Sequence, residues 1–227
     1  MDRRNRKAPA SADDASGQRA DVPSTDTTRI QLLGEAARLF RQQGVVATTM
    51  RQIADAMRMK AGSIYYYFDS KDEILDEVLD LGMQAVFNAV RHDVERLPSE
   101  TSSRRKIETA IAAHLRTLLR YGDFTSANIR IFSQVPERAK KRHLPLRQAY
   151  TDYWSRLFEE AQARGEVRSD INIKLLRLFL IGSLNWSLEW FNPKRGAVDD
   201  LARDIATMVF DGIAARSATE TASRNDR

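Results

Sequence analysis

The sequence predicts an all-α protein. From Thr27 onward, apolar residues recur with the 3.6-residue period of an amphipathic helix, and we find no segment with the two-residue alternation of a strand. Glycines and prolines are few, ten and six in 227 residues, and the prolines stand outside the periodic stretches. This pattern argues against a loop-rich all-β fold and a collagen-like chain.

The composition narrows the class of protein. There are no cysteines, which excludes disulfides, cysteine-ligated zinc and a cysteine nucleophile. No apolar segment follows the basic N-terminus, so it does not resemble a signal peptide. The most apolar stretch, residues 175–191, is interrupted by Arg177, Asn185 and Glu189, and we expect no membrane span. We therefore expect a cytoplasmic protein without a membrane partner.

The positive charge is concentrated in one part of the chain. The net charge is +5, and residues 27–71 hold seven basic and three acidic residues, a local excess of four. Such a patch indicates an anionic partner. The basic residues are Arg29, Arg38, Arg41, Arg51, Arg58, Lys60 and Lys71, against Glu35, Asp55 and Asp69.

The first half of the chain predicts a polar arm and four helices. Residues 1–26 lack an apolar period and are expected to be a disordered arm, either a solvated tail or a source of extra phosphate contacts. A first helix begins near Thr27 and ends at Gly44, and a second begins after Thr49. A short third helix covers 61–67. A long helix begins at the cap formed by 69–73 and continues to about Leu97.

The second half continues with the same period. We expect helices at 104–121, 125–135, 146–164, 173–191 and 198–216, separated by proline and glycine, and a polar tail at 217–227. The predicted domains are therefore 27–73 and 74–216, flanked by the arm and the tail.

Residues 49–71 have the sequence pattern of a helix-turn-helix motif. Two short helices joined by a tight turn can cross the DNA backbone with the first and lay the second in the major groove. The second helix begins with Ala61, Gly62 and Ser63, small residues that permit close approach. Three tyrosines, Tyr65, Tyr66 and Tyr67, combine apolar rings with hydroxyl donors, and Lys71 lies where a helix N-terminus favours a phosphate.

This segment resembles the TetR family of transcriptional regulators, whose signature reads T-x-R-x-I-A, a turn, G-T/S-L/I-Y-x-Y/H-F, then S-K. The matching residues are Thr49, Arg51, Ile53, Ala54, Gly62, Ser63, Ile64, Tyr65, Phe68, Ser70 and Lys71, with Phe40 and Gly44 at the end of the first helix. The resemblance implies DNA contacts from Arg51, Lys60, Ala61, Gly62, Ser63, Tyr65, Tyr66 and Lys71, with Tyr67 reaching a phosphate. It implies a miniature core of Ile53, Ala54, Ile64 and Phe68.

Two positions depart from the family pattern. Arg58 replaces the usual glycine of the turn, and Lys60 replaces a capping serine. A left-handed arginine costs about 1 kcal/mol relative to glycine, so we expect a differently drawn turn. Both replacements are basic, which suits either phosphate contacts or surface ion pairs.

The resemblance also implies a homodimer joined by the last two helices. Residues 173–191 are apolar on nearly every side, and 198–216 carry an apolar seam. The expected interface residues are Leu178, Ile181, Leu188, Leu201, Ile205, Met208, Val209 and Gly212. The alternative is that both seams belong to the core of a single chain.

Aromatic and polar residues in the second half suggest an effector pocket, the alternative being ordinary core. They are Phe124, Asn128, Phe132, Tyr150, Trp154, Asn185, Trp186 and Glu189. Trp186, Trp190, Phe191 and Pro193, followed by Gly196, are similar to a segment of TetR regulators that respond to acyl-CoA thioesters. We therefore expect an acyl-CoA effector. A basic run, Arg138, Lys140, Lys141, Arg142, His143 and Arg147, suits its phosphates or forms a solvated face.

Enzyme motifs are missing from the sequence. The three histidines, His92, His114 and His143, lack metal-ligand spacing, and no G-x-S-x-G, Walker or Rossmann pattern occurs. His114 is expected to be a satisfied core residue, and we expect neither cofactor nor metal. The leading hypothesis is a dimeric repressor that binds a palindromic operator and is released by a small effector. The alternatives are an activator, a repressor without a ligand, or a helical protein-interaction module. Residues 62–71 argue against the protein-interaction module.

Overall fold

The computed structural model describes residues 25–212, and all regular structure in that range is helical. The α-helices are α1 (Thr25–Ala47), α2 (Met50–Ala56), α3 (Lys71–Glu95), α4 (Ser103–Arg120), α5 (Gly122–Arg130), α6 (Glu137–Ala163), α7 (Ile173–Trp190) and α8 (Val198–Asp211). Two short 3-10 helices are η1 (Ala61–Tyr66) and η2 (Phe132–Gln134). The all-α prediction is confirmed. The predicted tail and nearly all of the predicted arm lie outside the described residues.

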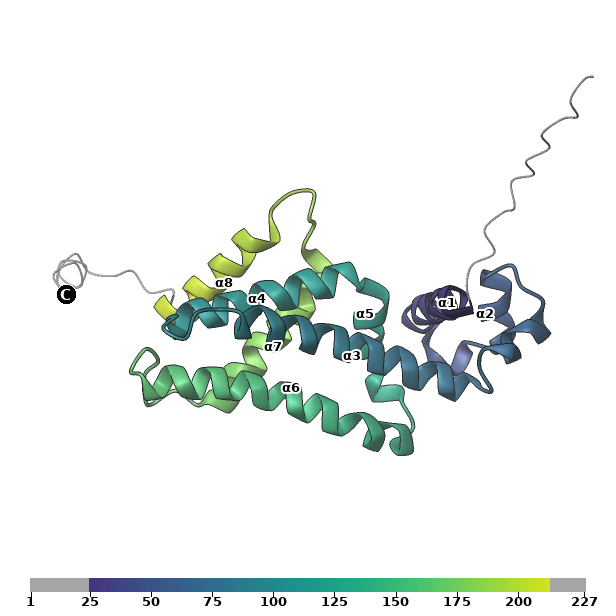
Figure 1. The fold of residues 1–227 in the computed structure, drawn as a ribbon, viewed down its shortest axis with the longest axis horizontal. Helices are drawn as coiled ribbons and strands as arrows, with labels where there is room; N and C mark the ends of the chain where they lie inside the picture. The colour runs from purple at the N-terminus through teal and green to yellow at the C-terminus, as the bar shows by residue number, and fades with distance from the viewer. Residues whose placement is uncertain (1–24, 213–227) are drawn as a thin grey trace, which may run out of the picture.

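Helix α3 connects the two ends of the molecule (Figure 1). Its first half contributes Ile74, Leu75, Val78 and Leu79 to a core shared with α1, α2 and η1. Its second half contributes Val86, Val90 and Val94 to a core shared with α4, α6, α7 and α8. The predicted boundary at 73/74 therefore falls inside one continuous helix, and a displacement of α3 would move both cores.

Helix α5 also contacts both the N-terminal core around α1 and the C-terminal part of the molecule. Ala127 of α5 and Ile131, which directly follows the helix, belong to the core around α1 and η1. Thr125, Asn128 and Ile129 face a cavity in the C-terminal part. The close packing of α3 on α5 depends on Gly82, where an added Cβ would stand 2.7 Å from the carbonyl oxygen of Phe124.

Helix α6 begins earlier than the sequence predicted. We expected it to start at residue 146, because proline breaks helices, yet it runs from Glu137 with Pro145 inside. Side-chain contacts hold the helix on both sides of that proline. His143 contacts Asp76 and Asp80 of α3, and Arg147 donates to Asn128 of α5. Helix α5 is shorter than predicted, since η2 takes up its expected end.

Helix α7 is the most apolar helix, yet no helix in the described range is long and apolar enough to cross a membrane.

Candidate DNA-binding surface and effector cavity

The turn before η1 is held by capping at both ends of α2. Thr49 accepts a hydrogen bond from the backbone of Gln52, whose side chain accepts one from the Thr49 backbone at 2.9 Å. At the other end, Arg58 has a φ of 54°. The Met59 amide reaches the Ala54 carbonyl at 2.9 Å, and the Arg58 amide reaches that of Asp55 at 2.9 Å. This is a Schellman motif. We expected a turn of another geometry at this position, and that expectation is wrong. The two hydrogen bonds hold Arg58 in the left-handed conformation that glycine usually adopts here.

The short helix η1 presents its small residues and two tyrosines to solvent. Ala61, Gly62 and Ser63 are exposed, and the exposed fractions of Tyr65 and Tyr66 are 57% and 76%. Ile64, between them, is fully buried against the core and fixes the face that η1 turns outward. Tyr67 differs, since it is half-buried and meets the Tyr66 ring edge-on, with centroids 5.1 Å apart.

Lys71 has partners inside the domain. Its Nζ donates to the backbone oxygens of Val45 and Thr48 at 2.7 and 2.8 Å. These carbonyls lie at the end of α1, where Gly44 has a φ of 82° and interrupts the helical geometry. An ammonium has three donors, so one remains for a phosphate. Lys71 therefore ties α1 to the start of α3 in addition to the phosphate role expected of it.

Some basic residues of the helix-turn-helix region have ion-pair partners and others have none within the described residues. Arg29 pairs with Glu77, Arg38 with Glu35, Arg41 with Asp123, and Arg51 with Asp55. Within the described residues, no ion pair involves Arg58 or Lys60, and both are exposed beside the start of η1. The unpaired positive charge thus stands next to the exposed tyrosines.

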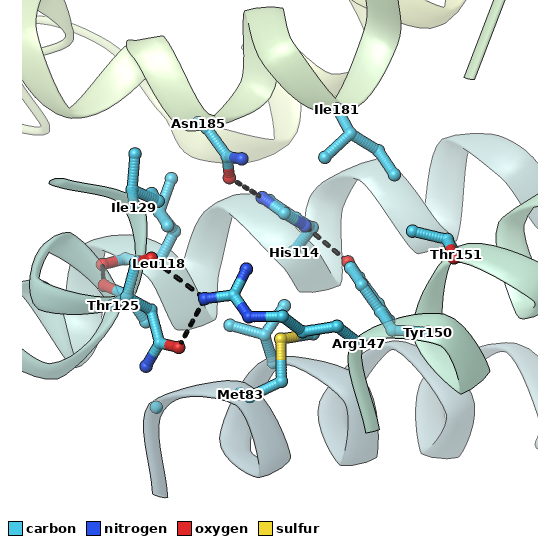
Figure 2. Close-up of a pocket in the computed structure, with 13 residues that line it drawn as sticks. Met83, His114, Leu118, Thr125, Ile129, Arg147, Tyr150, Thr151, Ile181 and Asn185 are labelled. Atoms are coloured by element: carbon cyan, nitrogen blue, oxygen red, sulfur yellow. Dashed lines mark hydrogen bonds between the residues drawn. The ribbon is translucent and has the colours of Figure 1, made fainter. Parts of the chain in front are cut away.

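A cavity of about 130 Å³ opens between α3, α4, α5, α6 and α7 (Figure 2). Three of the predicted pocket residues line it: Asn128, Tyr150 and Asn185. The lining is mainly apolar and includes Met83, Val86, Leu118, Ile129 and Ile181. Thr125 and Arg147 also line the cavity and were not predicted as pocket residues, because their inward orientation depends on how α5 and α6 pack.

His114 lies in the wall of the cavity and is buried, as expected of a satisfied core residue. Its Nδ1 is 2.5 Å from the Tyr150 hydroxyl, and its Nε2 is 3.2 Å from Oδ1 of Asn185. Burial lowers the pKa of His114 to about 4, against the opposing effect of the Asn185 hydrogen bond. The ring is therefore neutral at pH 7. Since the amide oxygen can only accept, Nε2 carries the proton and the Tyr150 hydroxyl donates to Nδ1.

Arg147 is the charged residue of the cavity wall. One terminal nitrogen donates to both the backbone oxygen and Oδ1 of Asn128, at 2.9 Å each, and the guanidinium carbon lies 3.6 Å from the centre of the Phe132 ring. Burial lowers the pKa of Arg147 to about 10, so it remains charged at neutral pH.

The other predicted pocket residues lie elsewhere. Trp154 is fully buried in the core, and Phe124 and Phe132 pack against the core around α1. Trp186 is 66% exposed on α7, and Glu189 pairs with Arg130 outside the cavity. In the basic run, Arg142 and His143 contact Asp76, which leaves Arg147 as the member that reaches the cavity.

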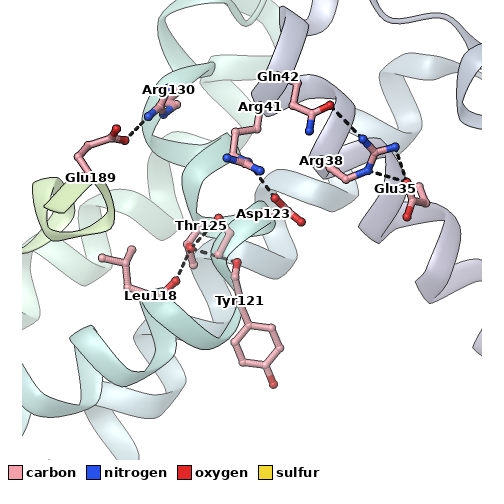
Figure 3. A network of polar contacts seen from close by, with 11 residues as sticks. Glu35, Arg38, Arg41, Gln42, Leu118, Tyr121, Asp123, Thr125, Arg130 and Glu189 are labelled. Carbon is pink, nitrogen blue, oxygen red and sulfur yellow. Dashed lines mark hydrogen bonds and ion pairs between the residues drawn. The ribbon is translucent and has the colours of Figure 1, made fainter. Parts of the chain in front are cut away.

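Two ion pairs tie α5 to its neighbours (Figure 3). Arg41 of α1 donates to Asp123 at 2.8 Å, and Arg130 of α5 pairs with Glu189 of α7. The helix that lines the cavity is thus joined by side chains to both the helix-turn-helix part and α7.

The outer face of α7 is apolar and exposed. Leu175, Leu178, Phe179, Trp186 and Trp190 are each more than half exposed, and so is Met208 of α8. Other predicted interface residues face inward in part, since Ile181, Leu201, Ile205 and Val209 pack against the C-terminal core. Leu188 is half-buried and Gly212 is exposed.

Comparison with known proteins agrees with this geometry. Residues 32–78 match the family model described as bacterial regulatory proteins, tetR family, and residues 100–213 match the model described as tetracyclin repressor-like, C-terminal domain. The HTH-type transcriptional repressor KstR2 of Rhodococcus jostii is 30% identical over 212 residues, covering 91% of this chain and 97% of that protein. KstR2 of Mycolicibacterium smegmatis is 26% identical over 183 residues, covering 76% and 84%.

Solved structures share the fold. The ketosteroid transcriptional regulator KstR2 of Mycobacterium tuberculosis superposes with a TM-score of 0.73 at 21% identity, covering 84% of this chain and 97% of that one. The chain belongs to the TetR family of transcriptional regulators, with an N-terminal helix-turn-helix domain and a C-terminal helical domain.

Proposed function

We propose that this chain is a dimeric transcriptional repressor that places η1 of each protomer in the major groove of a palindromic operator. The observation that carries the proposal is the surface of η1, where Tyr65 and Tyr66 are exposed beside the unpaired cations Arg58 and Lys60. Tyrosine rings and hydroxyls suit thymine methyls, base edges and phosphates, whereas free cations suit the phosphate backbone. Ala61, Gly62 and Ser63 leave room for the groove, and Arg51 and Tyr67 flank it.

The dimer is proposed to form through the outer face of α7 with Met208 of α8. Contiguous apolar surface of this kind marks interaction sites, and two antiparallel helices from each protomer make a four-helix interface. Trp186 and Trp190 belong to this face in our proposal, which revises the pocket role expected for Trp186.

For the effector we propose an acyl compound delivered as a CoA thioester. The support is the apolar lining of the cavity, its few polar groups, and the similarity of residues 185–196 to a segment of acyl-CoA-responsive regulators. Asn185 is the residue of that segment that lines the cavity. A cavity near 150 Å³ admits a benzene-sized group, so about 130 Å³ accepts a ring or short chain. The pantetheine and nucleotide would therefore lie outside it.

A mobility-shift titration tests this function. DNA selected from a random pool is bound by the protein and titrated with CoA thioesters beside their free acids and beside CoA alone. The proposal expects release by the thioesters. It is contradicted if no sequence is enriched from the pool, and the effector assignment is contradicted if unrelated hydrophobic compounds release the DNA while thioesters do not.

A further inference from the structure

We propose that the cavity recognises a carboxylate, and that Arg147 binds it. This inference rests on the proposed effector site and specifies the chemistry of its ligand: an otherwise apolar group of ring or short-chain size that carries one negative charge.

The charge of the cavity wall favours an anionic ligand. The described residues that line the cavity include no aspartate or glutamate, and none of the ion pairs within residues 25–212 involves Arg147. His114 is neutral, since burial lowers its pKa to about 4, and Tyr150 is neutral, since burial raises its pKa. The cavity wall therefore carries a net charge of +1 at pH 7. A partly buried cation without a counter-ion loses solvation, and an anionic ligand would offset that cost.

The geometry of the Arg147 guanidinium also favours a carboxylate. Within the described residues, only one terminal nitrogen of Arg147 donates hydrogen bonds, and both go to oxygens of Asn128. A guanidinium offers five N–H donors in a planar fork that matches a carboxylate. The guanidinium extends across the cavity between Thr125 and His114 (Figure 2). The side of the fork away from Asn128 is thus available to a ligand.

Most of the other polar groups of the cavity are satisfied by one another or by the backbone. His114 and Tyr150 satisfy each other, and Asn185 Oδ1 accepts from His114, so these groups present a neutral wall. Thr125 donates to backbone oxygens, at 2.9 Å for that of Leu118. Within the described residues, the free donors of the cavity are therefore those of Arg147 and the side-chain nitrogen of Asn185, and Arg147 is the charged one. The remaining lining is mainly apolar and suits a ring or a short chain.

A carboxylate could come from two sources. A free carboxylic acid would place its single carboxylate on Arg147, whereas the CoA half-thioester of a dicarboxylic acid would insert its far carboxylate. Both share the chemistry proposed here, and the experiment separates them.

The experiment is calorimetric titration of the protein without DNA, so that it is independent of operator release. One pair of probes is cyclohexanecarboxylate and its isosteric neutral carboxamide, and a second pair is adipyl-CoA and hexanoyl-CoA. We expect at least one carboxylate to bind about ten-fold tighter than its neutral partner, because charge-assisted hydrogen bonds are the stronger ones. The pair that shows the preference identifies the source. Equal or tighter binding of the neutral probes in both pairs would overturn the proposal.

Variants give a second, matched readout. Arg147→Met should abolish the preference for the carboxylate, and Arg147→Lys should retain part of it. The control is Arg156→Met, which removes an exposed arginine of the same helix that also lies over a ring, that of Tyr153. It should leave the preference unchanged. An Arg147→Met protein that is folded by its thermal melt and still prefers the carboxylate would overturn the proposal. If that variant does not fold, the comparison of probes on the unaltered protein decides.

Discussion

Arg147 and Asn128 are joined by two hydrogen bonds from a single guanidinium nitrogen, and this pair links the cavity to the helix-turn-helix part. Asn128 uses its amide nitrogen to donate to the backbone oxygens of Leu79 in α3 and Phe124 in α5, at 2.9 and 3.2 Å. A ligand that draws the guanidinium toward itself would loosen Asn128 and so change the contact of α5 with α3. Because α3 carries the first core as well as the second, such a change would alter the spacing of the two DNA-binding surfaces in a dimer.

The first prediction concerns this link. Asn128→Ala should bind the operator nearly as the unaltered protein does, yet respond less to the effector, with the ligand-induced loss of DNA affinity reduced by about ten-fold, within the usual range of coupling free energies. Fluorescence anisotropy with labelled operator measures both quantities. The control is Gln148→Ala, an exposed residue of α6 whose side chain donates to Asp152 and does not line the cavity. Full release from Asn128→Ala would show that the signal takes another route.

The second prediction concerns the turn. Arg58→Gly should raise the free energy of unfolding by about 0.5–1 kcal/mol, because glycine adopts the left-handed conformation without the Cβ penalty. The greater conformational entropy of glycine in the unfolded chain offsets part of this gain. Urea denaturation measures the change. The same variant should weaken binding to all DNA sequences alike, as expected for a phosphate contact. A loss of stability would mean that Arg58 has a stabilising contact that outweighs its backbone strain.

The third prediction is a pH dependence from His114. Its pKa is about 4 in the folded protein and near 6.5 when unfolded. Below pH 6.5 the unfolded chain gains a proton that the folded chain lacks, so stability falls as the pH decreases toward 4. The histidine should contribute a loss of about 2 kcal/mol between pH 7.5 and pH 5. In His114→Gln that contribution should be absent, which denaturation at the two pH values would reveal. Identical pH slopes for the two proteins would contradict the burial of a neutral ring.

The fourth prediction tests the dimer face. Phe179 is 70% exposed at the middle of the apolar face of α7. Phe179→Glu should give a folded monomer, because it places like charges opposite each other in a symmetric interface, and light scattering measures the mass. Lys174→Glu, on the same helix and exposed, is the control and should remain dimeric. A dimeric Phe179→Glu protein would exclude this face as the interface.

The fold and the DNA-binding surface could be predicted from the sequence more completely than the cavity. The helical period and the spacing of Thr49, Ile53, Ile64 and Tyr65 are local features, and local periodicity determines which faces are buried. The cavity depends on how α3, α5, α6 and α7 pack, which no local pattern records. Trp186 was therefore expected inside yet is exposed on α7, and Arg147 was expected among phosphate-binding residues yet faces the cavity. Pro145 was expected to precede α6, but tertiary contacts keep the helix continuous across this proline.

Footprinting on DNA selected from a random pool measures whether η1 reads a symmetric operator from a dimer. A dimer that does so should protect a palindrome whose half-sites lie about one helical turn apart. Tyr65→Ala should lose about 1–3 kcal/mol of binding to that site and little on random DNA, whereas Lys60→Ala should weaken binding to both. A single asymmetric half-site protected by a monomer, or equal losses from Tyr65→Ala on selected and random DNA, would contradict this mode of binding.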